Sequence, residues 1–202
     1  MMLEKFDIKK YDEVIARGLC SGVGKSDGQM CIEAAICYAL DLPHGDDPGC
    51  VTKAVRQYKI ELNDARWSSD NARAAGLRDL GIAQLGSLEV VNDIAFSTLL
   101  AEKTIRVLIP QLFRDIFTDP ELLAVADTCE SEGSIQSANA AASAAASASY
   151  AAASAATNAA TNAASYAATN AARDKYLILS ADLCMQCLAE LKSPGIELLS
   201  KR

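Results

Sequence analysis

Residues 138–172 read ANAAASAAASASYAAASAATNAATNAASYAATNAA, and this stretch decides the architecture that the sequence predicts. Alanine fills 21 of the 35 positions, and neither glycine nor proline interrupts them. Alanine has the highest intrinsic helix propensity, so the segment should be helical. An ordinary amphipathic pattern continues it to Leu191, and Ser193-Pro194-Gly195 is a stop signal. We therefore predict one long alanine-rich helix within residues 133–202.

A four-residue repeat inside this segment predicts how the helix packs. Thr157-Asn158, Thr161-Asn162 and Thr169-Asn170 are each followed by two alanines. Residues four apart form one ridge of a helix surface, and small side chains on a ridge let two backbones approach closely. The ridge either packs on the rest of the chain or forms a seam between copies. The second interpretation predicts self-association through the alanine-rich helix.

Residues 1–132 show recurrent helical periodicity and no sustained alternation of apolar and polar residues. We therefore predict an all-α protein, with an irregular helical bundle as a head (1–132) and the long alanine-rich helix as a second part (133–202). Asp27, Ser68 or Ser69, and Asp119 are the expected N-caps, and Pro110 should kink or end its helix. The expected head helices span residues 8–16, 28–42, 50–62, 68–86, 92–109 and 120–130.

The charge balance excludes some classes of partner. The chain carries 26 acidic and 19 basic residues, a net charge of −7, which repels phosphate backbones. No stripe of bases with interleaved aromatic residues is present, so we predict no nucleic-acid partner. Residues 133–172 have no charge, but their asparagines would be costly in hydrocarbon and Ile135 is their one large aliphatic residue. We therefore predict no membrane partner.

The cysteines indicate a reducing compartment. Their number, seven, is odd, and the charged residues within Met1–Lys10 do not fit a signal peptide. Disulfides are rare in the cytosol, where free cysteines behave as small buried hydrophobic residues. We therefore expect a cytoplasmic protein with reduced thiols.

A glycine-rich loop is the first candidate for ligand binding. Gly22-Val23-Gly24-Lys25-Ser26 resembles the end of a phosphate-binding loop, but Leu19 stands where that motif needs glycine and no strand precedes it. The loop is either a simple turn between helices or an anion-binding concavity made of backbone amides. The second interpretation predicts a small anionic ligand. The residues expected to bind it are Gly22, Gly24, Lys25, Ser26, Gln29, His44 and Trp67.

His44, the only histidine, lies between Cys37 and Cys50 in sequence. A cysteine and a histidine can perform nucleophilic chemistry, so Cys37, His44 and Cys50 are the candidate catalytic residues. Their spacing does not match a zinc site, which needs close pairs of ligands. Cys184 and Cys187 have the spacing of a redox or zinc motif but fall on one face of a helix. We predict no metal and no cofactor.

Three stretches resemble an uncharacterised family of helical proteins carried by bacteria and their phages. They are residues 28–40 (GQMCIEAAICYAL), 42–48 (LPHGDDP) and 63–69 (NDARWSS). An alanine-rich helix near the C-terminus also fits that family. The resemblance spans nearly the whole chain and implies an accessory protein of bacteria or phages. It implies no activity, cofactor or catalytic residue.

These observations favour a non-enzymatic binding or interaction protein that forms homo-oligomers. It would capture a small anionic, nucleotide-like ligand near the glycine-rich loop. An enzyme that uses Cys37 or Cys50 with His44 is the first alternative. A structural spacer or virion component is the second alternative.

Overall fold

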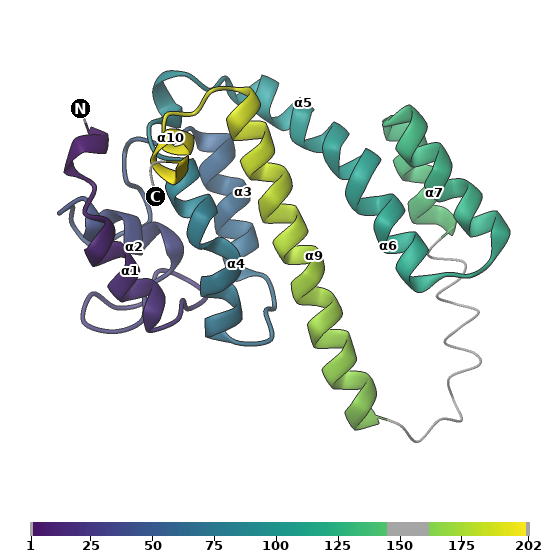
Figure 1. Cartoon of the computed structure of the whole chain (residues 1–202), viewed down its shortest axis with the longest axis horizontal. Coiled ribbons are helices and arrows are strands. Elements are labelled where there is room, and N and C mark those ends of the chain that lie inside the picture. Colours follow the sequence, from purple (N-terminus) through teal and green to yellow (C-terminus); the bar gives the residue numbers. More distant parts are fainter. Residues whose placement is uncertain (1, 145–161, 201–202) are drawn as a thin grey trace. The chain divides into compact units, whose positions relative to one another are not determined.

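The computed structural model describes residues 2–144 and 162–200, and they are built of helices (Figure 1). These ranges contain no strand, only isolated backbone bridges from Met30 to Leu19 and to Gly24. The predicted all-α class is therefore confirmed. The helices are η1 (Met2–Lys5), α1 (Ile8–Ala16), α2 (Ile32–Ala39), α3 (Lys53–Asp64), α4 (Asp70–Ala83), η2 (Ser87–Glu89), α5 (Asp93–Lys103), η3 (Thr104–Leu108), α6 (Ile109–Ile116), α7 (Pro120–Glu132), a helix over 135–144, α9 (Asn162–Glu190) and α10 (Gly195–Ser200).

The chain divides into two compact units. Unit 1 is Met1–Thr98 with Asn170–Arg202, and unit 2 is Leu99–Thr169. This division does not follow the boundary at residue 132 that the sequence suggested. The C-terminal segment belongs with the N-terminal helices because the apolar side chains of α9 are buried in their core. Those side chains are Ala181, Leu183, Cys184, Cys187 and Leu188, each at most 1% exposed.

Hydrogen bonds also tie the C-terminal segment into unit 1. Figure 1 shows the C-terminal half of α9 beside α3, where the Tyr58 hydroxyl donates to the carbonyl of Ser180 (3.2 Å). The Ser193 hydroxyl donates to the carbonyl of Ala83 (2.7 Å) at the end of α4. A Cβ on Gly195 would lie 2.1 Å from the carbonyl oxygen of Ile82, so only glycine fits there. The predicted stop at residues 193–195 is thus also an attachment point.

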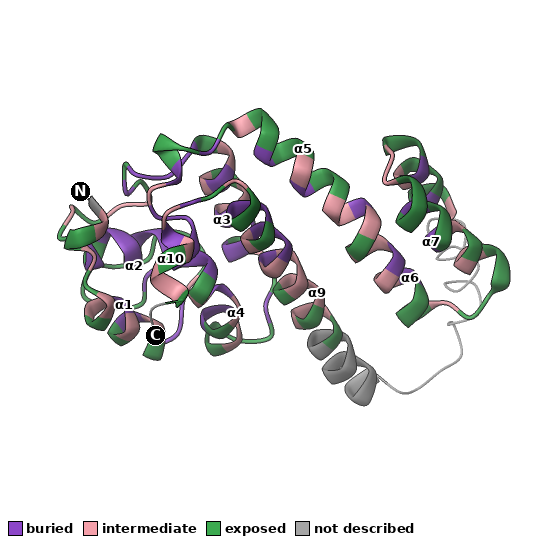
Figure 2. Cartoon of the chain, turned by 45° about the horizontal axis from the view of Figure 1, so that its top comes forward, coloured by how far each residue is buried: buried purple, intermediate pink, exposed green. Residues whose placement is uncertain are grey.

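Helix α2 is the most buried element of unit 1 (Figure 2). Every residue of it except Tyr38 is buried, including the charged Glu33. It packs against α1, α3 and α4. Any side chain at the N-terminus of α2 is therefore held in a fixed environment.

The start of α2 differs from the prediction. The helix begins at Ile32 with Cys31 as its N-cap, whereas the sequence suggested Gly28 with Asp27 as the cap. Residues 25–29 close a turn instead, since the amide of Lys25 donates to the carbonyl of Gln29 (2.9 Å). The amide of Cys20 then donates to Met30 (3.0 Å), which keeps the backbone extended up to residue 31.

Other helix starts follow the cap chemistry of the sequence. Ser69 caps α4 by accepting from the amide of Ala72, and Asp119 caps α7, with Pro120 at the first helical position. Thr52 caps α3 and accepts from the amide of Val55. A side-chain oxygen in these places satisfies an amide that has no partner inside the helix.

Unit 2 has a small apolar core. Pro110 does not end the helix predicted over 92–109, because the π-helical turn η3 precedes it and α6 continues past it. Proline lacks an amide and its ring clashes with the carbonyl four residues earlier, so a wider π-helical turn accommodates it. Arg106 donates to the carbonyls of Glu130, Ser131 and Glu132 at the end of α7. The buried core residues are Ile105, Phe113, Ala126, Cys129 and Ala141.

Part of the predicted long helix lies outside the described residues. Residues 135–144 and Asn162–Glu190 are helical, and residues 145–161 between them are not described. The continuity of a helix over 134–192, and self-association along it, therefore stay predictions. Among the described residues, no helix is both long and apolar enough to span a membrane.

Candidate functional site

The glycine-rich loop folds tightly against the start of α2. A Cβ on Gly24 would lie 2.2 Å from the carbonyl oxygen of Gln29, and its φ of +76° also favours glycine. The ring Nε2 of His44 lies 3.3 Å from the carbonyl oxygen of Gly24. The two sequence features singled out for ligand binding, this loop and His44, are therefore in contact.

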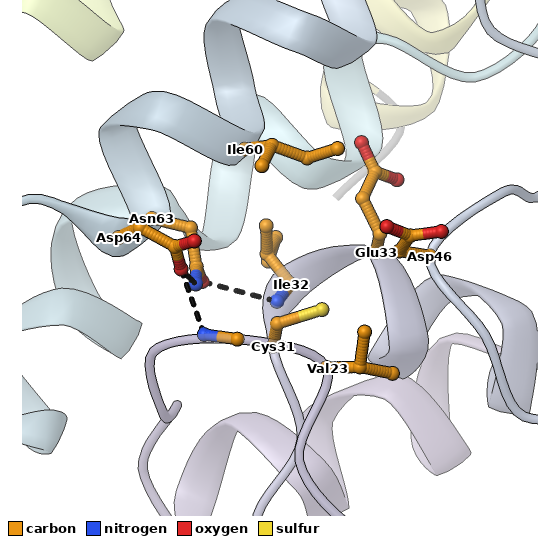
Figure 3. Close-up of a pocket in the computed structure, with 9 residues that line it drawn as sticks. Val23, Cys31, Ile32, Glu33, Asp46, Ile60, Asn63 and Asp64 are labelled. Carbon is orange, nitrogen blue, oxygen red and sulfur yellow. Dashed lines mark hydrogen bonds between the residues drawn. The ribbon is translucent and has the colours of Figure 1, made fainter.

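A pocket of about 170 Å³ lies between this loop, the start of α2 and the end of α3 (Figure 3). Its walls are apolar, from Val23, Ile32 and Ile60, with the Cys31 thiol facing its middle (Figure 3). Carboxylates flank these walls. The lining residues are Gly22, Val23, Cys31, Ile32, Glu33, Asp46, Ile60, Asn63 and Asp64.

Asn63 and Asp64 at the end of α3 fix one side of the pocket. The side-chain oxygen of the buried Asn63 accepts from the amide of Ile32 (3.2 Å), and its Nδ2 donates to the carbonyl of Cys20 (2.9 Å). Asn63 thus joins α3 to the glycine-rich loop and to α2. The amide of Ile32, which has no partner within α2, is therefore hydrogen-bonded by a side chain of α3.

The carboxylate of Asp64 receives several hydrogen bonds. Its Oδ1 accepts from the amide of Gly22 (2.8 Å), from Nδ2 of Asn63 (2.9 Å) and from the hydroxyl of Ser21 (3.3 Å). Partial burial raises the pKa of Asp64, but these hydrogen bonds outweigh it and leave the pKa below its usual value. Asp64 is therefore ionised at neutral pH.

A charged cluster lies behind the pocket wall. Glu33 and Lys59 are both fully buried, and Oε1 of Glu33 lies 2.8 Å from Nζ of Lys59. Nε2 of Gln84 donates to the other oxygen of Glu33 (3.0 Å). Burial lowers the pKa of Lys59, against the attraction of Glu33 that raises it. Oε1 of Glu33 and Nζ of Lys59 therefore satisfy each other as an ion pair, whereas Oε1 of Gln84 accepts no hydrogen bond from a described residue.

Asp46 forms the opposite side of the pocket, and its carboxylate is in an ion pair with Arg56. Its Oδ1 lies 2.8 Å from Nη2 of Arg56, and Nε of Arg56 donates to its carbonyl (2.6 Å). Among the described residues that line the pocket, no side chain is basic. The electrostatics of the lining therefore do not match the anionic ligand expected from the sequence.

The predicted ligand-binding residues do not form one site. Gly22 lines the pocket, and Gly24 contacts His44, but Lys25 and Ser26 are exposed and do not line it. Nε2 of Gln29 donates to Asp70 (3.1 Å) and to the carbonyl of Arg17 (3.3 Å).

Trp67 also lies outside the pocket. It is buried, and its Nε1 donates to the carbonyl of Leu62 (2.9 Å). A Cβ on Gly76 would lie 2.5 Å from its ring, so α4 packs directly on the indole. Trp67 is therefore a core residue in unit 1.

The candidate catalytic thiols are poorly suited to nucleophilic chemistry. Burial raises the pKa of Cys37 to about 12, and it also raises the pKa of Cys50. A thiol needs to ionise to act as a nucleophile, and both would stay protonated near neutrality. His44 is exposed and contacts Gly24.

The remaining cysteines form no group that could hold a metal ion in the described residues. Cys184 and Cys187 are fully buried, and burial raises the pKa of Cys184. No group of three or more cysteine, histidine or acidic side chains is arranged to hold a metal ion within residues 2–144 and 162–200.

Sequence reasoning missed the polar residues that shape the pocket: Glu33, Asp46, Lys59, Asn63, Asp64 and Gln84. One signal was present, because Glu33 is the only charged residue between Met30 and Leu40, in an otherwise apolar stretch. A charge on a buried helix needs a partner. Nothing in the sequence identifies that partner as Lys59.

In comparisons with known proteins, no family model, no curated protein and no solved structure matches this chain.

Proposed function

We propose that this chain is a non-enzymatic binding protein that holds a small molecule in the pocket beside Cys31. The observation that carries the proposal is a pocket of about 170 Å³ with apolar walls, backed by the fully buried pair Glu33 and Lys59. Ligand sites are typically concave and mostly apolar, with a few fixed polar groups. An apolar cavity of about 150 Å³ is large enough for a benzene-sized molecule.

The rigidity of the pocket supports binding without catalysis. Asn63 and Asp64 join three segments of backbone, and the packing around Gly24 leaves no room for a Cβ. A preformed site loses little conformational entropy when it binds. The raised pKa values of the buried thiols disfavour the cysteine–histidine enzyme considered as the alternative.

Blocking the pocket tests the proposal. The purified protein is incubated with a small-molecule extract of the expressing cells, desalted, and examined by native mass spectrometry and by analysis of heat-released compounds. Val23→Trp places a large ring at the pocket, whereas Val90→Trp changes an exposed valine that does not line it. We expect a bound compound in the wild type and in Val90→Trp but not in Val23→Trp. A wild type that binds nothing, or a Val23→Trp variant that binds equally, would overturn the proposal.

Self-association through the alanine-rich helix is proposed separately, and the support for it is the repeat of small residues in the sequence. The same mass spectra give the number of copies. A cytoplasmic location is also proposed, since all seven cysteines are free thiols. An accessory role in bacteria or phages has the resemblance of residues 28–40, 42–48 and 63–69 as its support. A structural spacer instead predicts that no pocket substitution affects binding.

A further inference from the structure

We infer that the pocket accepts a small organic cation, an amine with a compact apolar body. This inference rests on the proposed function and names the chemical class of its ligand. The apolar walls from Val23, Ile32 and Ile60 suit a hydrocarbon body. The polar groups around them are carboxylates, at Glu33, Asp46 and Asp64, and these suit an ammonium group.

The charges of the lining do not cancel. Glu33 is paired with Lys59 and Asp46 is paired with Arg56. Within the described part of the chain, no basic side chain lies within 4.0 Å of the carboxylate of Asp64. Its Oδ1 accepts three hydrogen bonds from the protein, and its Oδ2 accepts none from a described residue. One negative charge with a free acceptor therefore remains at the pocket.

Glu33 is an independent observation that favours a donor ligand. Its side chain is fully buried, and its Oε1 lies 2.8 Å from Nζ of Lys59 but accepts no hydrogen bond of standard geometry from a described residue. A carboxylate oxygen has two lone pairs, so Oε1 can accept a further hydrogen bond from a ligand that donates there. An ammonium group has three N–H donors and no acceptor.

Three backbone amides beside the pocket are already hydrogen-bonded to side chains of the protein. The amide of Gly22 donates to Asp64, and the amide of Ile32 donates to Asn63. The amide of Ala34 donates to the thiol of Cys31 (3.3 Å). The helix N-terminus that would attract an anion is therefore satisfied by side chains of the protein.

Three probes with the same hydrocarbon body and different head groups test this inference. They are n-butylammonium, 1-butanol and butyrate, each titrated at low salt into the ¹⁵N-labelled full-length protein while the amide resonances of the lining residues are followed. We expect the dissociation constant of n-butylammonium to be about tenfold lower than that of butyrate. The carboxylates of the pocket attract the ammonium group and repel the carboxylate of butyrate. Butyrate that binds as tightly as n-butylammonium would overturn the inference.

Asp64→Asn gives the site-specific control. The amide keeps an oxygen that accepts from Gly22 but removes the charge, so we expect it to reduce the preference for n-butylammonium at least about threefold. Asp46→Asn removes a charge on the other side and should have a smaller effect in the same direction. Asp41→Asn removes an exposed carboxylate outside the pocket and should leave the preference unchanged. An unchanged preference in both Asp64→Asn and Asp46→Asn would overturn the inference even if the probes bind.

This experiment and the blocking experiment fail separately. If none of the three probes shifts the lining resonances while a compound still binds in a Val23-dependent manner, the inferred amine class is wrong and the proposed function stands. If Val23→Trp leaves the binding of the compound unchanged, the proposed function is wrong whatever the three probes show.

Discussion

The two units of this chain differ in the kinds of side chain that they bury. Unit 1 buries charged and amide side chains among its apolar residues, including Glu33, Lys59, Asn63, Arg73 and Gln84. Among the described residues of unit 2, the buried side chains are apolar apart from that of Ser137, and Arg114 forms ion pairs at the surface. Burying an ion pair seldom increases stability, because desolvation offsets the attraction between the charges. Within the described part of the chain, all buried charged side chains therefore lie in unit 1.

Breaking the buried pair should have the largest effect on unit 1. Lys59→Met leaves Glu33 buried without its partner, and we expect it to lower the free energy of unfolding by about 3–5 kcal/mol. Urea unfolding followed by the fluorescence of Trp67, the only tryptophan, measures this in unit 1.

The double variant Glu33→Gln/Lys59→Met is the matched control. It removes both charges but keeps an oxygen that accepts from Gln84, so it should be more stable than Lys59→Met alone. If the double variant loses the sum of the two single losses, the pair is not coupled as we describe.

Truncating the apolar core should destabilise unit 2 by a similar or smaller amount. Phe113→Ala removes a ring that is 3% exposed, and we expect a loss of about 3 kcal/mol, the lower end of the range for buried phenylalanine. Hydrogen exchange of the α7 amides measures it. The Trp67 transition reports unit 1 and should shift less than the α7 exchange does; an equal shift would contradict separate cores.

Arg106 should stabilise the end of α7 by a smaller amount. Its guanidinium donates to three terminal carbonyls, a charge-assisted arrangement that compensates for their missing helix partners. We expect Arg106→Ala to cost about 1–2 kcal/mol, seen as faster hydrogen exchange in the last turn of α7. Arg106→Lys keeps the charge but not the planar fork, so it should restore only part of the protection. Full protection in Arg106→Ala would contradict this role.

The smallest effect expected is a pH dependence at Asp64. Its pKa in the folded state lies below the ordinary value of 3.8, so its ionised form contributes stability above that value and loses it as the pH falls through the folded pKa. Asp64→Asn cannot titrate. The difference in unfolding free energy between wild type and Asp64→Asn should therefore shrink between about pH 6 and pH 2.5. A difference that stays constant over that range would show that the hydrogen bonds to Asp64 are not charge-dependent.

The sequence predicted local structure better than it predicted the site. The bounds of α1 and the caps Ser69 and Asp119 follow from short-range chemistry, and they are confirmed. The predicted start of α2 was wrong because the turn over residues 25–29 uses backbone groups that a helix beginning at Gly28 would need. Helix propensity and capping residues depend on neighbours along the chain, so they do not predict such competition.

The site could not be predicted because its partners are distant in sequence. Gln84 and Glu33 are 51 positions apart, and no pattern of either segment marks them as neighbours. The glycine-rich loop was identified as a candidate, and it does border the pocket through Gly22 and Val23. The sequence could not show that the amide of Gly22 is already bonded to Asp64 and that of Lys25 to the carbonyl of Gln29.

Alkylation of the cysteines in the folded protein tests the central claim, that small molecules reach the interior of unit 1 beside Cys31. Peptide mass spectrometry after iodoacetamide treatment compares Cys31 with Cys184 in unit 1 and Cys129 in unit 2, all three buried and with pKa values raised by burial. We predict that Cys31 reacts faster than both and that Val23→Trp removes the difference. Equal rates for Cys31 and Cys184 in the wild type would contradict the account.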